Sequence, residues 1–342
     1  MVIVMGANAT PADIDHVLAR LQEQGCRGER TVGVERTIIT VVGPATPALQ
    51  EDVRLLPHVV GVVLLGKSYD RASLDSHPEP TTVRIGDAAL IGGEQLALIV
   101  GPGAVESAAQ LSALAPALRQ GRATVLMGGA LRPAQSPYAF TGLGEDGLRH
   151  LAAARQATGL PILEQVPDIA ALETVARYAD ALEIGAHSMT NFGLLEAVAA
   201  TGKPILLRRG LSATLDEWLL SAERILLAGN PNVVLCEAGI RTYETATSLT
   251  PDISAIPALK RLTHLPVLAD PARASGRAEL VPDLALAAIA AGADGLILEL
   301  HPNPDRALAD GPQSLTPDQF VALSARIAAL APAVGRSLPP PA

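Results

Sequence analysis

Aromatic side chains, cysteines and long apolar runs are all scarce in this chain. Aromatic residues make up 2% of the 342 residues while hydrophobic residues make up 49%, so the core must be built from Leu, Val, Ile and Ala. No apolar run approaches the roughly 20 residues of a membrane-spanning helix, and the opening segment lacks a basic n-region. Cys26 and Cys236 are far apart, and Cys236 falls in an apolar segment, so we expect no disulfide. These features predict a cytoplasmic globular protein.

Positive charge is also in short supply. The chain carries 26 Lys and Arg residues against 35 Asp and Glu residues, a formal net charge of −9. A surface that binds nucleic acid concentrates basic residues, because it must neutralise a row of phosphates. We therefore expect no nucleic-acid partner and no membrane partner. The expected partners are a small-molecule carboxylate substrate and further copies of the chain, as a homo-oligomer (dimer or tetramer).

Residues 1–75 have the pattern of a small domain. The segment "PADIDHVLARLQEQ" predicts an amphipathic helix, with Thr10 as its N-cap, Pro11 at its first position and Gly25 after its end. Strands are predicted at "VIVM", "RTIITVVG" and "VVGVVLL", and a second helix at "TPALQEDVRLL". If "TVGVE" supplies the remaining strand, the order is βαββαβ, the ferredoxin-like arrangement. The segment "YDRASLDSHPEP" that follows has the composition of a linker.

Residues 76–334 show a regular alternation of apolar and helical segments, after a predicted hairpin at "TVRIGDAALIGG". Continuous apolar strands, such as "LALIVGP" and "GLILELHP", are typical of a parallel sheet covered on both faces. Eight βα units in sequence favour a (β/α)₈ barrel over an open sheet. The predicted fold class is therefore α/β, a (β/α)₈ TIM barrel preceded by a ferredoxin-like βαββαβ domain. Residues 335–342 form a Pro-rich tail.

Charged residues gather at the expected carboxyl ends of the barrel strands, where barrel enzymes place their functional groups. They include Arg132, Glu164, Glu183, His187, Arg208, Arg209, Arg241, Asp270, Arg273, Glu299, His301 and Asp310. One interpretation is a set of ion pairs that hold the loops together. The other is a polar active site, because charges in a barrel mouth are costly unless they are paired or used.

Motifs at these strand ends carry a family resemblance. The segments "IVGPGAVES", "SPYAFTGLG", "VLADPARASGR" and "DGPQSLTP" are similar to those of the type I 3-deoxy-D-arabino-heptulosonate 7-phosphate (DAHP) synthases, of the variety with an N-terminal ferredoxin-like domain. The resemblance extends over nearly the whole chain. It implies an enzyme that condenses phosphoenolpyruvate with erythrose 4-phosphate, and that binds a divalent metal through Cys, His, Glu and Asp.

The residues at the metal and phosphate positions depart from this family pattern. By resemblance the Cys position is Gly103 and the His position is Arg273, so only Glu299 and Asp310 match the metal ligands. Cations of the phosphate sites are replaced too, by Met127, Ala134 and Ala238. Each lost charge-assisted hydrogen bond would be worth roughly 1.5–3 kcal/mol. We therefore expect no bound metal, no cofactor and no grip on two phosphorylated substrates.

These departures predict an enzyme repurposed for a small carboxylated substrate without phosphates, metal-independent and belonging to specialised metabolism beside the shikimate pathway. Its reaction would form or cleave a C–C bond, eliminate a group or close a ring. The expected catalytic residues are Glu164, Glu183, His187 and Arg273. The expected substrate-binding residues are Arg132, Arg208, Arg209, Arg241, Glu299, Asp310 and His301.

Two other functions stay open at this point. A non-catalytic homologue would bind a metabolite or a true DAHP synthase and regulate it through residues 1–75, a domain that in the family can bind an aromatic amino acid. A working DAHP synthase is the third hypothesis, and the loss of two metal ligands disfavours it.

Two further expectations concern the geometry of the mouth. Glu164 and Glu183 should come near a common point, because "ILEQV" and "ALEIG" place Glu at the same position of neighbouring strands. Arg273 should reach the space left by the metal, beside Glu299 and Asp310, as a fixed positive charge that presents N–H donors to a substrate oxygen. The alternative for Arg273 is a salt bridge that merely neutralises those carboxylates.

Overall fold

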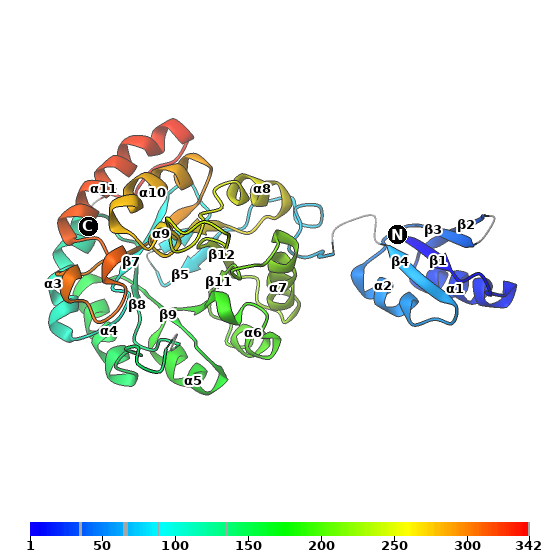
Figure 1. Cartoon of the computed structure of the whole chain (residues 1–342), viewed down its shortest axis with the longest axis horizontal. Coiled ribbons are helices and arrows are strands. Elements are labelled where there is room, and N and C mark those ends of the chain that lie inside the picture. Colours follow the sequence, from blue (N-terminus) through cyan, green and yellow to red (C-terminus); the bar gives the residue numbers. More distant parts are fainter. Residues whose placement is uncertain (34–35, 64–67, 88, 134–135, 341–342) are drawn as a thin grey trace. The chain divides into compact units, whose positions relative to one another are not determined.

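The computed structural model describes residues 1–33, 36–63, 68–87, 89–133 and 136–340. The chain divides into two units, Met1–Ser76 and His77–Ala342. In Figure 1 the first unit is coloured in blues, and the second runs from cyan to red. Within the described ranges, no helix has the length and apolar character needed to span a membrane.

The first unit is an antiparallel sheet with two helices packed on one face. Its elements are β1 (Val2–Met5), α1 (Pro11–Glu23), β2 (Arg27–Val32), β3 (Thr37–Val42), α2 (Pro47–Arg54) and β4 (Val59–Val63). The sheet order is β2-β3-β1-β4, which confirms the predicted ferredoxin-like fold. The strand expected at "TVGVE" begins earlier than predicted, since β2 pairs with β3 from Arg27 onward; residues 34–35 of that segment lie outside the described ranges.

Helix α1 begins where the sequence predicts it to begin. The Thr10 hydroxyl accepts a hydrogen bond from the Asp13 N–H at 3.3 Å, and the Asp13 carboxylate accepts one from the Thr10 N–H at 2.8 Å. This reciprocal pair satisfies N–H groups that have no partner within the helix. The buried face of α1, which comprises Ile14, Val17 and Leu21, joins the sheet residues in one apolar cluster.

The second unit is a closed barrel of parallel strands. The strands are β7 (Ala97–Gly101), β8 (Val125–Gly128), β9 (Ile162–Gln165), β10 (Ala181–Ile184), β11 (Ile205–Arg208), β12 (Val233–Glu237), β13 (Val267–Ala269) and β14 (Gly295–Glu299). Pairing of β14 with β7 closes the ring, so the predicted TIM barrel is confirmed. Their residues are almost all buried, as the continuous apolar segments predict.

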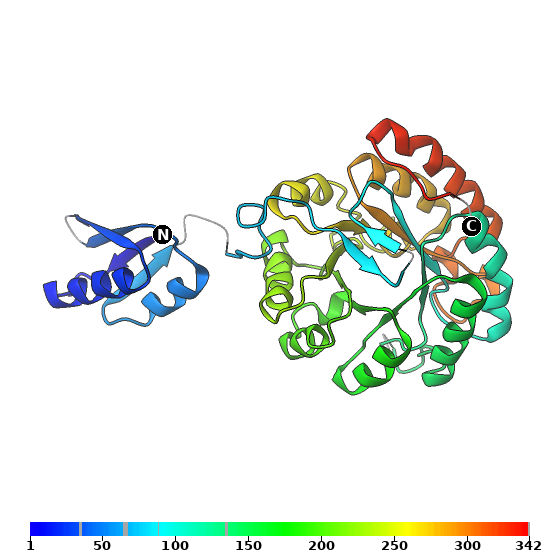
Figure 2. The same ribbon diagram turned by 180° about the vertical axis from the view of Figure 1, so that it is seen from behind.

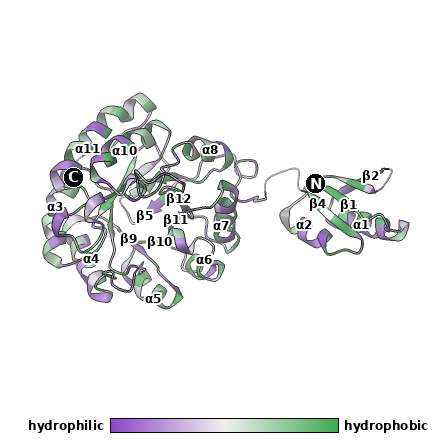
Figure 3. Cartoon of the chain, in the orientation of Figure 1, coloured by the Kyte–Doolittle hydropathy of each residue, from purple (hydrophilic) through white to green (hydrophobic). Residues whose placement is uncertain are grey.

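Helices surround the barrel in the order of the chain (Figure 1). They are α3 (Ala108–Gln120), α4 (Glu145–Thr158), α5 (Ile169–Tyr178), α6 (Phe192–Ala199), α7 (Leu215–Leu227), α8 (Ala255–Leu262), α10 (Val281–Ala290) and α11 (Pro317–Leu330), while the short α9 (Pro271–Ser275) lies inside this ring, directly after β13. In Figure 3 they carry both hydrophobic and hydrophilic residues, as expected for helices with one face on the strands and one in water.

A short hairpin closes the amino end of the barrel. Strand β5 (Val83–Ile85) pairs with β6 (Ala89–Ile91), and Figure 2 shows the hairpin in front of the barrel strands. Its buried side chains share one apolar cluster with interior barrel residues such as Ile99, Val125 and Ile297. Because apolar side chains fill this end, polar groups can gather only at the opposite, carboxyl end of the strands.

Candidate active site

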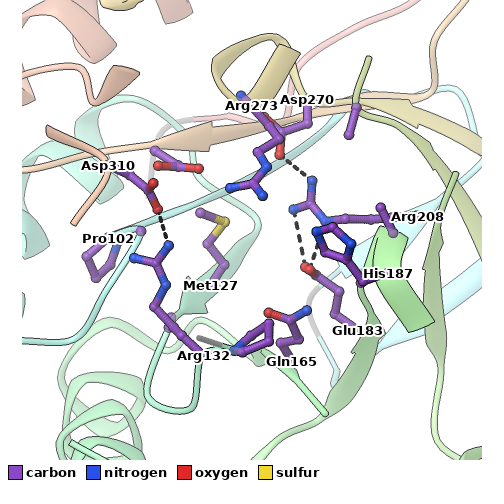
Figure 4. Close-up of a pocket in the computed structure, with 18 of the residues that line it drawn as sticks. Pro102, Met127, Arg132, Gln165, Glu183, His187, Arg208, Asp270, Arg273 and Asp310 are labelled. Carbon is purple, nitrogen blue, oxygen red and sulfur yellow. Dashed lines mark hydrogen bonds and ion pairs between the residues drawn. The ribbon is translucent and has the colours of Figure 1, made fainter. Parts of the chain in front are cut away.

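The carboxyl ends of the barrel strands surround a cavity of about 110 Å³. Figure 4 shows side chains from several strands and from the loops that follow them pointing into this cavity. Of the residues predicted from the sequence, those that line it are Arg132, Glu183, His187, Arg208, Arg273, Glu299 and Asp310. The remaining predicted residues, Glu164, Arg209, Arg241 and His301, are not among its lining.

Arg208, the last residue of β11, is locked between two carboxylates. Its Nε donates to Glu183 Oε1 at 2.7 Å, and its Nη1 donates to Asp270 Oδ2 at 2.5 Å. Burial opposes the charge of Arg208, but the carboxylates of Glu183 and Asp270 outweigh it, so the pKa of Arg208 lies well above its ordinary value. The guanidinium is therefore a permanent cation whose charge is already balanced.

A second ion pair joins two loops across the mouth. Arg132, in the loop between β8 and α4, donates through Nη2 to Asp310 Oδ2 at 2.5 Å. Asp310 adopts a left-handed backbone conformation, with φ of 56°, which a non-glycine residue adopts only at a cost. The Arg132 Nη1 is buried and has no hydrogen-bond partner in the described part of the chain. This nitrogen is available to a ligand.

Glu299, at the end of β14, is a buried carboxyl beside this pair. Its Oε1 accepts a hydrogen bond from Gln313 Nε2 at 2.7 Å, whereas its Oε2 has no partner among the described residues. Burial, followed by repulsion from Asp310 and Asp270, raises the pKa of Glu299 to about 8; Arg273 acts in the opposite direction.

Arg273 differs from the other arginines of the cavity. Its backbone N–H donates to the Asp270 side chain at 2.8 Å, which starts helix α9 and fixes the residue at the edge of the mouth. Figure 4 shows the guanidinium extending into the cavity between Asp310 and Arg208. Within the described ranges this guanidinium has no hydrogen bond or ion pair. Its donors therefore face the space that a ligand would fill.

The side chains present do not fit the divalent metal that the resemblance implies. Gly103 offers no ligand, and a Cβ built there would lie 2.7 Å from Glu299 Oε2, so that carboxyl has taken up the space. Asp310 is already bound to Arg132, and Arg273 would repel a cation. Among the described residues, no group of three or more His, Cys, Asp and Glu side chains is placed to hold an ion.

The structure places Glu164 away from the cavity. In the parallel register Glu183 pairs with Gln165, and Glu164 pairs with Leu182, so the two glutamates are out of step by one residue. Side chains alternate along a strand, and a shift of one residue therefore sends them in different directions. Glu183 lines the cavity, whereas Glu164 is fully buried against the start of the β8–α4 loop.

Three other predicted substrate-binding residues have different surroundings. Arg209 is buried and donates to Glu237 at 2.9 Å and to Asp252 at 2.8 Å, so it holds the loop after β12. Arg241 is exposed in that loop. His301 accepts a hydrogen bond on Nδ1 from the Asn303 N–H, so its Nε2 carries the proton that faces Glu106 at 3.3 Å. The contacts of Arg209 and His301 order loops, and none of the three residues lines the cavity.

The cavity also contains residues to which sequence reasoning gave no role. Gln165 lines it from β9, and Asp270 lines it from the end of β13 while it holds Arg208. Alternation along β9 lets only one of Glu164 and Gln165 face the cavity, and the sequence does not say which. Met127 and Ala238, where the resemblance places cations, line the cavity as well; Ala134 lies outside the described ranges.

The barrel with this charged mouth defines a class, and comparison with known proteins names it. Residues 77–334 match the DAHP synthetase I family, and residues 1–65 match the DAHP synthase ferredoxin-like domain. The chain therefore belongs to the DAHP synthetase I family.

Two relatives and a solved structure are similar over most or all of the chain. A phospho-2-dehydro-3-deoxyheptonate aldolase of Thermotoga maritima is 40% identical over 335 residues, which cover 98% of this chain and 99% of that protein. The crystal structure described as phospho-2-dehydro-3-deoxyheptonate aldolase (DAHP synthase) from Thermotoga maritima matches with a TM-score of 0.88 and 39% identity, over 99% of both chains. A 2-dehydro-3-deoxyphosphooctonate aldolase of Syntrophotalea carbinolica is 33% identical over 258 residues, which cover 70% of this chain and 92% of that protein.

The prediction of an enzyme repurposed for a substrate without phosphates is wrong. The full-length match to a phospho-2-dehydro-3-deoxyheptonate aldolase overturns it, and overturns the alternative of a non-catalytic regulator. The prediction considered each cation missing from the family's phosphate positions separately. The fold brings Arg132, Arg208 and Arg273 to a single cavity, so cations line it although Met127 and Ala238 carry no charge.

Proposed function

We propose that this chain is a DAHP synthase, which condenses phosphoenolpyruvate with erythrose 4-phosphate. The reaction joins carbon 3 of phosphoenolpyruvate to the aldehyde carbon of the sugar phosphate, takes up water and releases phosphate. The full-length similarity to a phospho-2-dehydro-3-deoxyheptonate aldolase supports this assignment. Both substrates are phosphate esters whose charge keeps them within the cytoplasm, where the enzyme would act.

The observation that carries the proposal is the unpaired guanidinium of Arg273 in the cavity. Arg208 is held by Glu183 and Asp270, and Arg132 by Asp310, so among the described lining arginines Arg273 is the one whose donors are free for a ligand. A planar guanidinium binds a carboxylate or a phosphate through two parallel hydrogen bonds. Arg273 would hold an anionic group of a substrate, and the buried Arg132 Nη1 would supply a further donor.

The finer part of the proposal is that the chain works without a divalent metal. The aldehyde oxygen becomes more negative as the C–C bond forms, and a fixed donor aimed at it lowers the barrier. Arg273 has N–H groups in the cavity and no partner among the described residues, so it would stabilise this oxygen. His187 also lines the cavity and has no hydrogen bond in the described ranges, which leaves its ring free to move a proton.

The test is an assay of the purified full chain with phosphoenolpyruvate and erythrose 4-phosphate. Product and released phosphate would be measured after extensive treatment with a chelator, and again after adding Mn²⁺, Zn²⁺ or Mg²⁺. We expect DAHP to form at a similar rate in every case. Absence of product under all conditions would refute the synthase, whereas product only with added metal would refute the metal-free mechanism.

A matched variant checks the metal site by binding rather than by activity. Gly103→Cys combined with Arg273→His restores the two ligand types that the resemblance implies beside Glu299 and Asp310. We expect this double variant to bind about one divalent ion per chain by elemental analysis, because a soft and an imidazole ligand join two carboxylates. The unmodified chain should bind none. Equal metal content in both proteins would contradict the reading of the cavity.

A further inference from the structure

Glu164 is buried at a place where nothing in the reaction requires an acid. Its side chain is 0% exposed, and it does not line the cavity. Its Oε1 accepts hydrogen bonds from two successive backbone N–H groups, that of Ala130 at 3.1 Å and that of Leu131 at 3.3 Å. The next residue in the chain is Arg132, which reaches Asp310 across the mouth.

Other bonds at the start of the β8–α4 loop leave the N–H groups of Ala130 and Leu131 to Glu164. The Gly129 carbonyl accepts from the Val105 N–H at 3.2 Å, and the Ala130 carbonyl accepts from the Gly144 N–H at 2.9 Å. The loop begins with Gly128 and Gly129, which have no side chains to anchor it. A Cβ at Gly129 would lie 2.2 Å from the Gly103 carbonyl oxygen, so this segment must pass close to the neighbouring loop without one. The carboxyl from the next strand thus supplies the acceptor that the N–H groups of Ala130 and Leu131 require.

The environment of Glu164 favours the neutral acid. Burial raises its pKa well above the ordinary value; the N–H groups of Leu131 and Ala130 act in the opposite direction, and repulsion from Glu183 adds to the rise. A neutral carboxyl and a glutamine amide present the same carbonyl oxygen to the two N–H groups. A glutamine could therefore keep the contacts of Glu164, although it could not transfer a proton.

We propose that Glu164 is a positioning residue, whose carboxyl oxygen fixes the backbone of Ala130 and Leu131 so that Arg132 is held in the cavity opposite Asp310. The role of Arg132 as an anion ligand rests on the proposed function, whereas the anchoring of the loop does not. Glu164 acts through Arg132 and does not touch the reacting atoms.

The test compares two variants of matched size in the full-length chain. Glu164→Met keeps the length of the side chain and removes the acceptor, and Glu164→Gln keeps the acceptor. We expect Glu164→Met to weaken phosphoenolpyruvate binding, measured by calorimetry, by about tenfold, and to raise KM with kcat nearly unchanged. Glu164→Gln should stay within about twofold of the original chain, since it preserves both hydrogen bonds.

A double-mutant cycle separates positioning from general support of the fold. In an Arg132→Ala background, Glu164→Met should have an effect below about twofold on phosphoenolpyruvate binding, because the residue through which it acts is gone. An undiminished effect would overturn the proposal. A loss in Glu164→Gln as large as that in Glu164→Met would overturn it too, because it would point to proton transfer.

Hydrogen exchange gives a reading that requires neither turnover nor ligand. The Ala130 and Leu131 amides should exchange at least about tenfold faster in Glu164→Met than in the original chain, and at the original rate in Glu164→Gln. Unchanged exchange in Glu164→Met would refute the anchoring even if the chain proves to be no synthase. If Glu164→Met does not fold, Glu164→Gln still decides: protected amides support the anchoring and exposed amides refute it.

Discussion

Arg208 and Arg273 lie in the same cavity and have opposite surroundings. Arg208 directs its N–H groups at Glu183 and Asp270, while the guanidinium of Arg273 has no partner in the described part of the chain. A buried arginine with balanced charge maintains the shape of a site, because breaking its ion pairs leaves carboxylates stranded. An arginine with free donors retains the capacity to bind a ligand. We therefore distinguish a structural cation, Arg208, from a proposed functional cation, Arg273.

The largest effect is expected when the structural cation is removed. Arg208→Ala leaves Glu183 and the almost fully buried Asp270 without their partner. The free energy of unfolding should fall by about 3–5 kcal/mol, the usual cost of breaking a buried ion pair from one side. Chemical denaturation of the variant measures this. A loss below about 1 kcal/mol would show that Arg208 is no more structural than Arg273.

Removal of the functional cation should instead affect turnover. Arg273→Ala should reduce kcat/KM for DAHP formation by about 100-fold, as loss of a donor to a developing negative charge typically does. Its unfolding free energy should change by less than about 0.5 kcal/mol, because no ion pair of the described residues is broken. Arg273→Lys is the matched control and should restore part of the activity, since it keeps the charge and loses the planar fork. A large loss of stability in Arg273→Ala would show that Arg273, like Arg208, stabilises the fold.

The pH dependence of stability tests the charge that faces Arg273. Glu299 has its pKa raised to about 8 in the folded chain, from 4.5, so the folded state holds the proton more tightly than the unfolded state. Its contribution to stability is complete below pH 4.5 and is lost as the pH rises through 8, with a slope of at most about 1.4 kcal/mol per pH unit. Denaturation at several pH values should show that Glu299→Gln reduces this slope. An unaltered slope would mean that Glu299 is ionised throughout.

The smallest effect is expected at an arginine outside the cavity. Arg241 is exposed in the loop after β12. Arg241→Ala should change the unfolding free energy by less than about 0.5 kcal/mol, as surface substitutions usually do. The activation free energy derived from kcat/KM should change by no more than that. Steady-state kinetics and chemical denaturation of Arg241→Ala, measured side by side with the Arg208 and Arg273 variants, would check this. A marked rise in KM would show that Arg241 contributes to substrate binding.

The sequence predicted the barrel and the end of the barrel where the site lies, because both follow from the periodicity of apolar segments. It did not predict which of two adjacent side chains enters the cavity. Gln165 and Glu164 are neighbours on β9, and only the stagger between strands, set by closure of the barrel, decides which one faces inward.

The sequence also did not predict which distant carboxylates pair with each arginine. Arg208 and Arg209 are adjacent, yet one reaches Glu183 and Asp270 in the cavity and the other reaches Glu237 and Asp252 beside it. The prediction treated both as substrate ligands because it counted charges at strand ends. Charge type is visible in a sequence, whereas the partner that neutralises it depends on the fold.

The β5–β6 hairpin has a consequence for molecular traffic. Its apolar side chains close the amino end of the barrel. A ligand can therefore enter and leave the cavity only at the carboxyl end. In a cavity with a single entrance, the ligand that binds deepest would bind first and leave last. The closed amino end would therefore influence the order in which ligands bind and leave, although the hairpin lies at the opposite end of the barrel from the cavity.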